Sequence, residues 1–263
     1  MYTHNLDPVL INFGFIIIRW YSLAYIFGIV IGWWLGKKII KSVVNKTAIK
    51  FNLSIFDDLI TYLIISIIIG GRLGYVIFYN PTYYLSNPLE IFQVWEGGMS
   101  FHGALIGIIL GTYLFSIKKN INTFFLLDVI ACVSPIGIFL GRIANFINGE
   151  LVGKISNVPW AVIFPAVDMI PRHPSQLYEA ILEGLILFFL LNFFINKKNY
   201  TTGKCSYLFL IFYGTLRIVS EIFREPDVQV GNFFGFLSMG IILSLIMILF
   251  GIFIIIRLKK NVL

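Results

Sequence analysis

One stretch of the sequence decides the fold class, and it reads Phe124-Phe-Leu-Leu-Asp-Val-Ile-Ala-Cys-Val-Ser-Pro-Ile-Gly-Ile-Phe-Leu-Gly-Arg142-Ile-Ala-Asn145-Phe-Ile-Asn-Gly-Glu150. Its almost wholly apolar part is close to the roughly 20 residues that cross about 30 Å of hydrocarbon. A charged side chain at the centre of a membrane helix costs roughly 2.5–3.5 kcal/mol on insertion scales. Arg142 therefore indicates a partner, an aqueous cavity or an anionic ligand. The alternative is an interfacial arginine that snorkels to lipid phosphates.

The composition of the whole chain agrees with a membrane protein. Hydrophobic residues make up 58% and charged residues only 13%, with a mean hydropathy of +0.88, whereas ordinary soluble domains carry about 25% charged residues. The net charge of +7 does not indicate a nucleic-acid binder, because the lysines form short clusters between apolar segments. The two cysteines, Cys132 and Cys205, lie within apolar stretches and are expected to be packing residues.

Seven apolar segments are each long enough to be a membrane helix. The predicted fold is an all-α polytopic membrane protein with about seven transmembrane helices, organised as a single domain over residues 1–263. The first segment is expected to remain as a helix and not to be a cleaved signal peptide, because no lysine or arginine precedes Arg19. The segments are approximately Phe13–Gly36, Ile55–Phe78, Met99–Ile117, Phe124–Ile143, Leu177–Ile195, Tyr207–Ile222 and Phe233–Ile256.

The lysines predict the orientation of these segments. With the exception of Lys154, they occupy alternate connections or the C-terminal tail, as at Lys37, Lys118 and Lys197, and the positive-inside rule assigns those connections to the cytoplasm. An odd number of spans then places the N-terminus outside and the C-terminus inside. A small extracytoplasmic loop region is expected between about Gly149 and Ser175.

This topology brings distant polar residues to a similar depth near the outer face. Arg72, His102, Arg142 and Arg217 with Glu221 all lie at the outer ends of their segments. Three buried arginines without compensation would cost on the order of 10 kcal/mol, and Glu221 cannot neutralise them all. An anionic ligand such as a lipid phosphate would supply the missing charge. An internal salt-bridge network in a structural bundle is the alternative.

The local sequence around two of these residues fits a polar site. Tyr213, Arg217 and Glu221 follow one another at intervals of one helical turn, so that Glu221 can hold Arg217 in place, and Arg224 lies a turn further on. Arginine is better suited than lysine to a phosphate, because its planar fork donates two hydrogen bonds and keeps its charge. His102 follows Gly97-Gly-Met-Ser100 and is expected in the first turn of a helix capped by Ser100. It is either a satisfied interfacial residue or a group suited to proton transfer.

Several long motifs follow one another along the chain. They are Trp20-Tyr21, Gly71-Arg72-Leu-Gly-Tyr75, Gly97-Gly-Met-Ser-Phe-His102-Gly103, Gly141-Arg142-Ile-Ala-Asn145-Phe-Ile-Asn-Gly-Glu150, Arg172-His-Pro-Ser-Gln-Leu-Tyr-Glu179 and Arg217 to Asp227. In these motifs and their order, the chain resembles the prolipoprotein diacylglyceryl transferase family over essentially its whole length. The resemblance implies a transferase of the bacterial cytoplasmic membrane, with its active site toward the outer leaflet. It would move a diacylglyceryl group from phosphatidylglycerol to the lipobox cysteine in the signal peptide of a prolipoprotein and release glycerol phosphate.

The resemblance also implies roles for individual residues. Arg142 and Arg217 would hold the phosphate, with Glu221 orienting Arg217, and His102 is the candidate base. Asn145 and Tyr21 would donate or accept hydrogen bonds to the headgroup or the peptide. The expected catalytic residues are thus His102, Arg142, Arg217 and Glu221, and the expected substrate-binding residues are Tyr21, Arg72, Asn145, Glu150, Tyr213 and Arg224. Phosphatidylglycerol, the prolipoprotein signal peptide and membrane lipids are the expected partners, and the sequence indicates no metal, nucleotide or other cofactor and no nucleic acid.

Two other classes of function remain open at this point. An anion transporter or channel would also use outer arginines, but it should carry polar residues through the full thickness of the bundle. Here the inner halves are nearly uncharged apart from Asp128. A non-catalytic lipid-binding scaffold is compatible with the arginines but gives less reason for His102 and Asn145 beside them.

Overall fold

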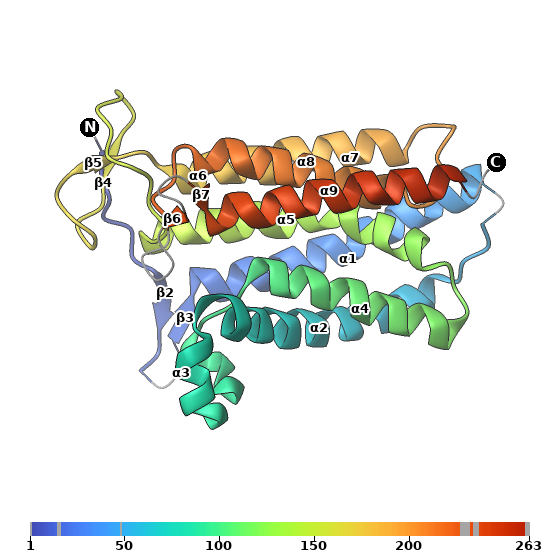
Figure 1. The fold of residues 1–263 in the computed structure, drawn as a ribbon, viewed down its shortest axis with the longest axis horizontal. Coiled ribbons are helices and arrows are strands. Elements are labelled where there is room, and N and C mark those ends of the chain that lie inside the picture. The colour runs from blue at the N-terminus through green and yellow to red at the C-terminus, as the bar shows by residue number, and fades with distance from the viewer. Residues whose placement is uncertain (1, 15–16, 48, 227–231, 234–236, 261–263) are drawn as a thin grey trace.

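Long helices run roughly side by side along the main axis of the molecule (Figure 1). The computed structural model describes residues 2–14, 17–47, 49–226, 232–233 and 237–260. Asp227, the last residue of the family-like stretch, lies outside these ranges. The long helices are α1 (Trp20–Lys46), α2 (Leu53–Tyr79), α4 (Phe101–Lys119), α5 (Thr123–Asn148), α8 (Lys204–Glu221) and α9 (Met239–Lys260), and a continuous helical run combines α6 (Ser175–Glu179), a π-helix (Ala180–Ile186) and α7 (Leu187–Ile195).

The predicted apolar segments all correspond to helices, and the membrane class is confirmed. Within the described ranges, six helices are long and apolar enough to cross a membrane. Helix α8 matches the sixth predicted segment but is not among the six, since it carries Lys204, Arg217 and Glu221. The count of seven spans and the orientation of the termini therefore stay predictions.

Two predicted boundaries are wrong. The first segment was expected from Phe13, but α1 begins at Trp20, because the chain before it forms the antiparallel pair β2 (Val9–Asn12) and β3 (Ile17–Arg19). The last segment was expected from Phe233, yet α9 begins at Met239, after the paired strands β6 (Asn232–Phe233) and β7 (Leu237–Ser238). In both places apolar residues form a short strand pair beside a helix, and hydropathy alone does not distinguish the two.

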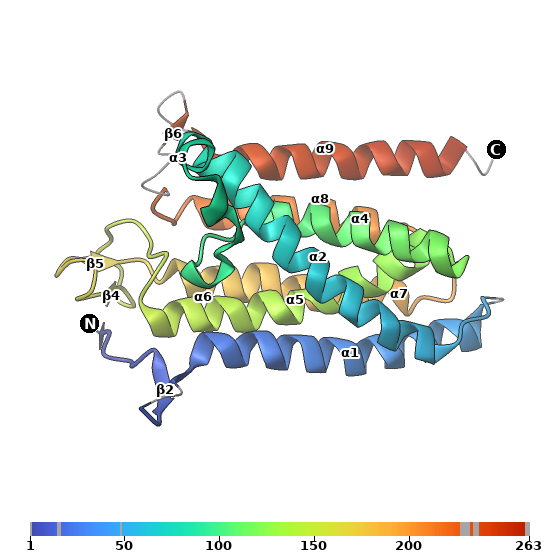
Figure 2. The same ribbon diagram turned by 90° about the horizontal axis from the view of Figure 1, so that it is seen from below.

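Helix α5 lies at the centre of the bundle, where it packs against α1, α8 and the run of α6, the π-helix and α7 (Figure 2). Small residues allow the closest crossings. A Cβ atom built on Gly28 of α1 would lie 3.1 Å from the Cα of Gly137 in α5, and one built on Gly74 of α2 would lie 2.5 Å from the Cα of Gly103 in α4. This is the packing expected of small-residue stripes in membrane helices.

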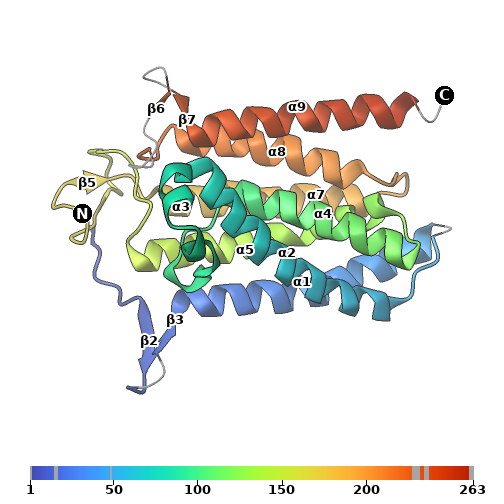
Figure 3. The same ribbon diagram turned by 60° about the horizontal axis from the view of Figure 1, so that its bottom comes forward.

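Irregular structure gathers at the end of the bundle where the chain begins (Figures 1 and 3). Strand β1 (Tyr2–Thr3) pairs with β4 (Val162–Ile163), which pairs with β5 (Pro171–Arg172), so the N-terminal segment is tied to the polar connection before α6. Helix α3 (Pro81–Ser86) and two 3-10 turns (Pro88–Phe92 and Val94–Glu96) lead into α4 at the same end.

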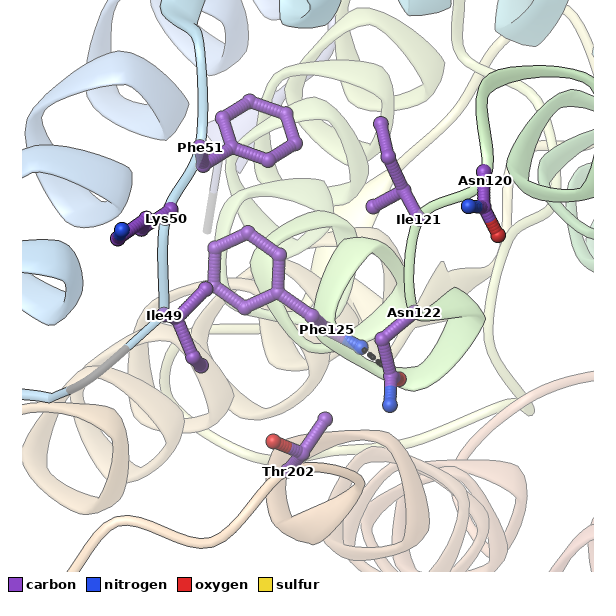
Figure 4. Close-up of a pocket in the computed structure, with 8 residues that line it drawn as sticks. All are labelled: Ile49, Lys50, Phe51, Asn120, Ile121, Asn122, Phe125 and Thr202. Carbon is purple, nitrogen blue, oxygen red and sulfur yellow. Dashed lines mark hydrogen bonds between the residues drawn. The ribbon is translucent and has the colours of Figure 1, made fainter.

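The opposite end holds the connections α1–α2, α4–α5 and α7–α8 (Figure 1). There the buried Asp128 carboxylate of α5 accepts hydrogen bonds from Tyr200 Oη (2.7 Å), the Gly203 amide (2.6 Å), and the amide and hydroxyl of Ser206 (both 2.6 Å). Asp128 thus anchors the start of α8 to α5. A cavity of about 230 Å³ lies nearby between the three connections (Figure 4). It is lined in part by Lys50, Asn122, Phe125 and Thr202 and is far from Arg142.

Candidate active site

Arg142 lies late in α5 and is held by two glutamates of the neighbouring helical run. Its Nε atom is 2.8 Å from Glu179 Oε2, and its Nη2 atom is 3.2 Å from Glu183 Oε2. The two carboxylate side chains are fully buried, at 0% exposure. Arg142 therefore does not snorkel to the lipid surface, and its charge is met inside the bundle.

The helical run of α6 and the π-helix presents these glutamates. Glu179 ends α6, and Glu183 lies within the π-helix Ala180–Ile186 that continues it. A Cβ atom built on Gly184 would lie 2.6 Å from the Cβ of Phe139, so the wide turn packs directly on α5. Short π-helical segments are rare and occur frequently at functional sites. Here the segment places two carboxylates against one arginine.

Helix α8 contributes the second arginine of the cluster, Arg217, and the third, Arg224, follows shortly after the helix ends at Glu221. Arg217 Nη1 lies 3.1 Å from Glu179 Oε1 and 3.3 Å from Glu183 Oε1, while Arg217 Nη2 lies 2.6 Å from Glu221 Oε2. Arg224 Nη1 lies 3.2 Å from Glu179 Oε1. Glu179 thus bridges the three arginines of what we call the arginine cluster, namely Arg142, Arg217, Arg224, Glu179, Glu183 and Glu221.

The charges of the arginine cluster balance. Three guanidinium groups face three carboxylates, so the predicted charge deficit is wrong, and the internal salt-bridge network that was its alternative is present. The two carboxylates that balance the charge in addition to Glu221 are Glu179 and Glu183. Both lie in the fifth apolar segment or at its edge, and the rule that an intramembrane charge needs a partner applies to them as it does to Arg142.

Glu221 also contacts the start of α9. Its Oε1 atom accepts a hydrogen bond of 2.8 Å from Ser238 Oγ, and Ser238 Oγ in turn accepts one from the Ile241 amide. A Cβ atom built on Gly240 would lie 2.7 Å from Glu221 Oε1, so glycine is needed there for the carboxylate to fit. Glu221 thus contacts both Arg217 and the start of α9, and the N-terminal end of a helix favours a negative charge.

His102 lies in the first turn of α4, as predicted, and Ser100 caps that turn by accepting a hydrogen bond from the Gly103 amide. The Phe101 ring stacks on the Tyr213 ring of α8, with centroids 4.6 Å apart. This contact brings the start of α4 to the turn before Arg217. The His102 Nε2 atom is buried and has no hydrogen-bond partner among the described residues, which leaves it open to a substrate group.

Asn145, Glu150 and Tyr21 lie beside the cluster rather than within it. Asn145 Nδ2 donates a hydrogen bond of 2.7 Å to Glu150 Oε1, and Gln176 Nε2 donates one of 2.6 Å to the backbone carbonyl of Glu150. Tyr21 lies in the first turn of α1, which packs along α5, and its hydroxyl lies 3.4 Å from that of Tyr25. These residues form a polar margin beside Arg142.

Arg72 has different partners from the other predicted arginines. Its guanidinium donates hydrogen bonds of 2.6 Å to the carbonyls of Glu90 and Gly97 and one of 2.9 Å to the carbonyl of Ile91. It also lies 5.1 Å from the centre of the Tyr84 ring. Arg72 therefore fixes the connection that leads into α4 and His102.

The connection before α6 is tied to the same end of the site. The Asp168 carboxylate pairs with Arg172 Nη2 at 2.5 Å; hydrogen bonds from Arg172 lower the pKa of Asp168, and Asp168 raises the pKa of Arg172. Burial, with a smaller effect of Lys154, lowers the pKa of His173. Gly153 forms a backbone bridge with Arg224. Thus the ion pair stabilises the connection itself, and the backbone bridge links the connection to the cluster.

Comparison with known proteins gives a consistent match. A family model described as prolipoprotein diacylglyceryl transferase matches residues 8–257. Three proteins named phosphatidylglycerol–prolipoprotein diacylglyceryl transferase are similar to the chain. The one from Rickettsia felis is 51% identical over 253 residues, covering 95% of this chain and 96% of the relative. The one from Rickettsia typhi is 50% identical over 263 residues (99% and 100%), and the one from Rickettsia rickettsii strain Sheila Smith is 52% identical over 254 residues (95% and 96%).

Proposed function

The chain belongs to the prolipoprotein diacylglyceryl transferase family, and from this membership we propose how the arginine cluster takes part in the reaction. The protein is a multi-pass membrane transferase. It transfers the diacylglyceryl group of phosphatidylglycerol to the lipobox cysteine of a prolipoprotein, the first step of lipoprotein maturation. A thioether forms, and glycerol phosphate leaves.

This reaction needs two things from the protein. The cysteine sulfur displaces a phosphate ester at a glycerol carbon, so the thiol must lose its proton and the departing phosphate must be stabilised. Arg142 and Arg217 bind that phosphate. The observation that carries this proposal is that guanidinium groups from α5 and α8 converge on the same buried carboxylates. Donors fixed in a water-poor site stabilise developing charge without having to reorganise.

The neighbouring residues support the two arginines. Glu221 orients Arg217 through its ion pair of 2.6 Å, and Arg224 places a third positive charge beside Glu179. Asn145, Glu150 and Tyr21 form hydrogen bonds to the headgroup or the peptide at the outer margin. Tyr213 aligns α8 with α4 through its stacking on Phe101, and Arg72 acts indirectly by holding the connection before α4.

His102 is the base that takes the proton from the thiol. Its support is geometric, because its Nε2 atom is buried and has no hydrogen-bond partner in the described part of the chain, and the neighbouring Phe101 stacks on Tyr213 of the helix that carries Arg217. An imidazole is suited to proton transfer near neutral pH.

The site faces the outer leaflet of the bacterial cytoplasmic membrane. The support for this orientation is the separation of charges along the bundle. The connections α1–α2, α4–α5 and α7–α8 lie together at one end of the bundle (Figure 1). Lys46 and Lys118 end or nearly end α1 and α4, and Lys197 follows α7, whereas Arg142 and Arg217 lie late in α5 and α8, toward the other end. Lysine-rich connections are retained in the cytoplasm.

A single assay tests the function. The purified protein is incubated with phosphatidylglycerol and a lipobox peptide, and the peptide cysteine is examined by mass spectrometry. The expected result is a diacylglyceryl adduct on the sulfur, together with glycerol phosphate. A protein that binds the lipid but leaves the cysteine unmodified would instead support the scaffold, and passage of an anion across vesicles without the adduct would support the transporter.

A further inference from the structure

We infer that Glu183 competes with the substrate phosphate for Arg142 and Arg217, and that it releases both arginines when phosphatidylglycerol binds and takes them back when glycerol phosphate leaves. This inference rests on the proposed function, since it takes Arg142 and Arg217 as the phosphate site. Glu183 is then a positioning residue, not a group that touches the reacting atoms.

The first reason is the balance of charge. The cluster holds three guanidinium groups and three carboxylates. A phosphodiester adds a negative charge to this buried set, and an excess charge in a site of low polarity is costly. The phosphate and the carboxylates also compete for the same guanidinium donors, so a phosphate bound by Arg142 and Arg217 displaces a carboxylate from them.

The second reason is the placement of Glu183. One of its oxygens faces Arg142 Nη2 at 3.2 Å, and the other faces Arg217 Nη1 at 3.3 Å. A phosphate held by both arginines would present two oxygens in the same way. Charged N–H to oxygen contacts are ordinarily about 2.7–2.9 Å, so these two contacts are long. Glu183 therefore occupies the phosphate position with a comparatively weak hold.

The third reason is that the other two carboxylates have further partners. Glu179 also binds Arg224 and makes the shorter contact to Arg142, at 2.8 Å. Glu221 is held by Ser238 at the start of α9 and by Arg217 at 2.6 Å. In the part of the chain that the structure describes, the arginine contacts of Glu183 are confined to Arg142 and Arg217. Its carboxylate also accepts a hydrogen bond of 2.9 Å from Ser220 Oγ.

The test is the affinity for glycerol phosphate, measured as its inhibition constant in the peptide assay. Glu183→Gln removes the competing charge, so glycerol phosphate should inhibit about tenfold more strongly, which is the change expected when one charged hydrogen-bond competitor is lost. The KM for phosphatidylglycerol should fall in parallel, whereas the rate of a single turnover should not rise. A purely structural role predicts the opposite, namely weaker binding of both ligands.

Matched variants keep the test decisive. Glu183→Asp retains the charge and should return the inhibition constant toward the wild-type value. Ser220→Ala leaves the charge count unchanged but loosens Glu183, so it should strengthen inhibition by a smaller factor. Asp128→Asn removes a buried carboxylate at the other end of α5 and should leave the inhibition constant unchanged.

The outcomes that overturn the inference are separate from those that overturn the proposed function. A folded Glu183→Gln protein with unchanged or weaker inhibition by glycerol phosphate overturns the role of Glu183. If that variant does not fold, an unchanged inhibition constant in Ser220→Ala overturns it instead. If Arg142→Lys and Arg217→Lys both bind glycerol phosphate as well as the wild type does, the phosphate site itself is wrong.

Discussion

Arg142 of α5 and Glu179 of α6 form an ion pair of 2.8 Å in the interior of the bundle. Glu179 also contacts Arg217 of α8 and Arg224, which follows the end of α8. One carboxylate thus joins arginines from two helices, and the phosphate site that we propose depends on this junction.

Replacing Arg142 or Arg217, which we propose to bind the phosphate, should nearly abolish transfer. In Arg142→Ala or Arg217→Ala, thioether formation should fall by about 100-fold or more, which is the cost of removing one donor that stabilises developing charge. Alanine also leaves buried carboxylates short of a partner, at a cost of roughly 3–5 kcal/mol. Lysine variants keep the charge without the planar fork, so they should retain the fold and still lose most activity. Near-normal turnover in either lysine variant would contradict the proposal that Arg142 and Arg217 bind the phosphate.

Replacing His102 should remove the proton acceptor. His102→Gln should lower the rate of thioether formation at least tenfold, because general-base catalysis contributes typically 10²–10⁴-fold. The rate of the variant should then rise with pH across pH 6–9, since more of the peptide thiol ionises by itself. The measurement is a pH profile of product formed, with Tm as a control for folding. Retention of most activity over this whole range would exclude His102 as the base.

Adding a methyl group at Gly240 should disturb Arg217 at a distance. The new Cβ atom would lie 2.7–2.9 Å from the Glu221 carboxylate, so Gly240→Ala should displace Glu221 from Arg217. We expect a fall of roughly tenfold in kcat/KM, equivalent to about 1.4 kcal/mol of lost transition-state stabilisation. Gly137→Ala is the matched control, because a Cβ atom there meets nothing within 4 Å. Equal effects of the two variants would indicate general loosening of the bundle.

Asp128 should matter for stability and little for chemistry. Asp128→Asn leaves several buried donors of the α8 start with a weaker acceptor, and we expect a loss on the order of 2–3 kcal/mol. A thermal unfolding curve should show a lower Tm, while kcat below the transition stays close to the wild-type value. A drop in kcat at unchanged Tm would mean that Asp128 takes part in the reaction.

The proposed orientation predicts which surface is reachable from outside the cell. A cysteine introduced at the exposed Asn157, in the connection between α5 and α6, should react with an impermeant maleimide in intact cells. One introduced at the exposed Asn199, in the lysine-rich α7–α8 connection, should react only after the membrane is opened. The native cysteines, Cys132 and Cys205, are buried and serve as the background control. The reverse pattern of labelling would place the site on the cytoplasmic side.

The sequence was sufficient for features that depend on composition and local order. Apolar runs of about 20 residues predict membrane helices because hydrocarbon leaves a helix as the simplest way to satisfy every backbone polar group. The motifs around Arg142, His102 and Arg217 identified the family, which the comparisons confirm. The helix ends beside β3 and β7 were wrong, since short apolar strands resemble the start of a span.

The tertiary structure decided how the charges are shared. The sequence shows that Arg142 needs an anion, but the identity of that anion depends on which helix packs against α5 and at what rotation. The π-helix sets this rotation and turns Glu179 and Glu183 toward Arg142 and Arg217. In the sequence, Arg72 is likewise an arginine near the end of an apolar segment. Its guanidinium group, however, donates hydrogen bonds to carbonyl oxygens of the connection before α4 and not to carboxylates. Burial can be predicted from a single segment, whereas the partner of a buried charge is fixed by contacts between segments.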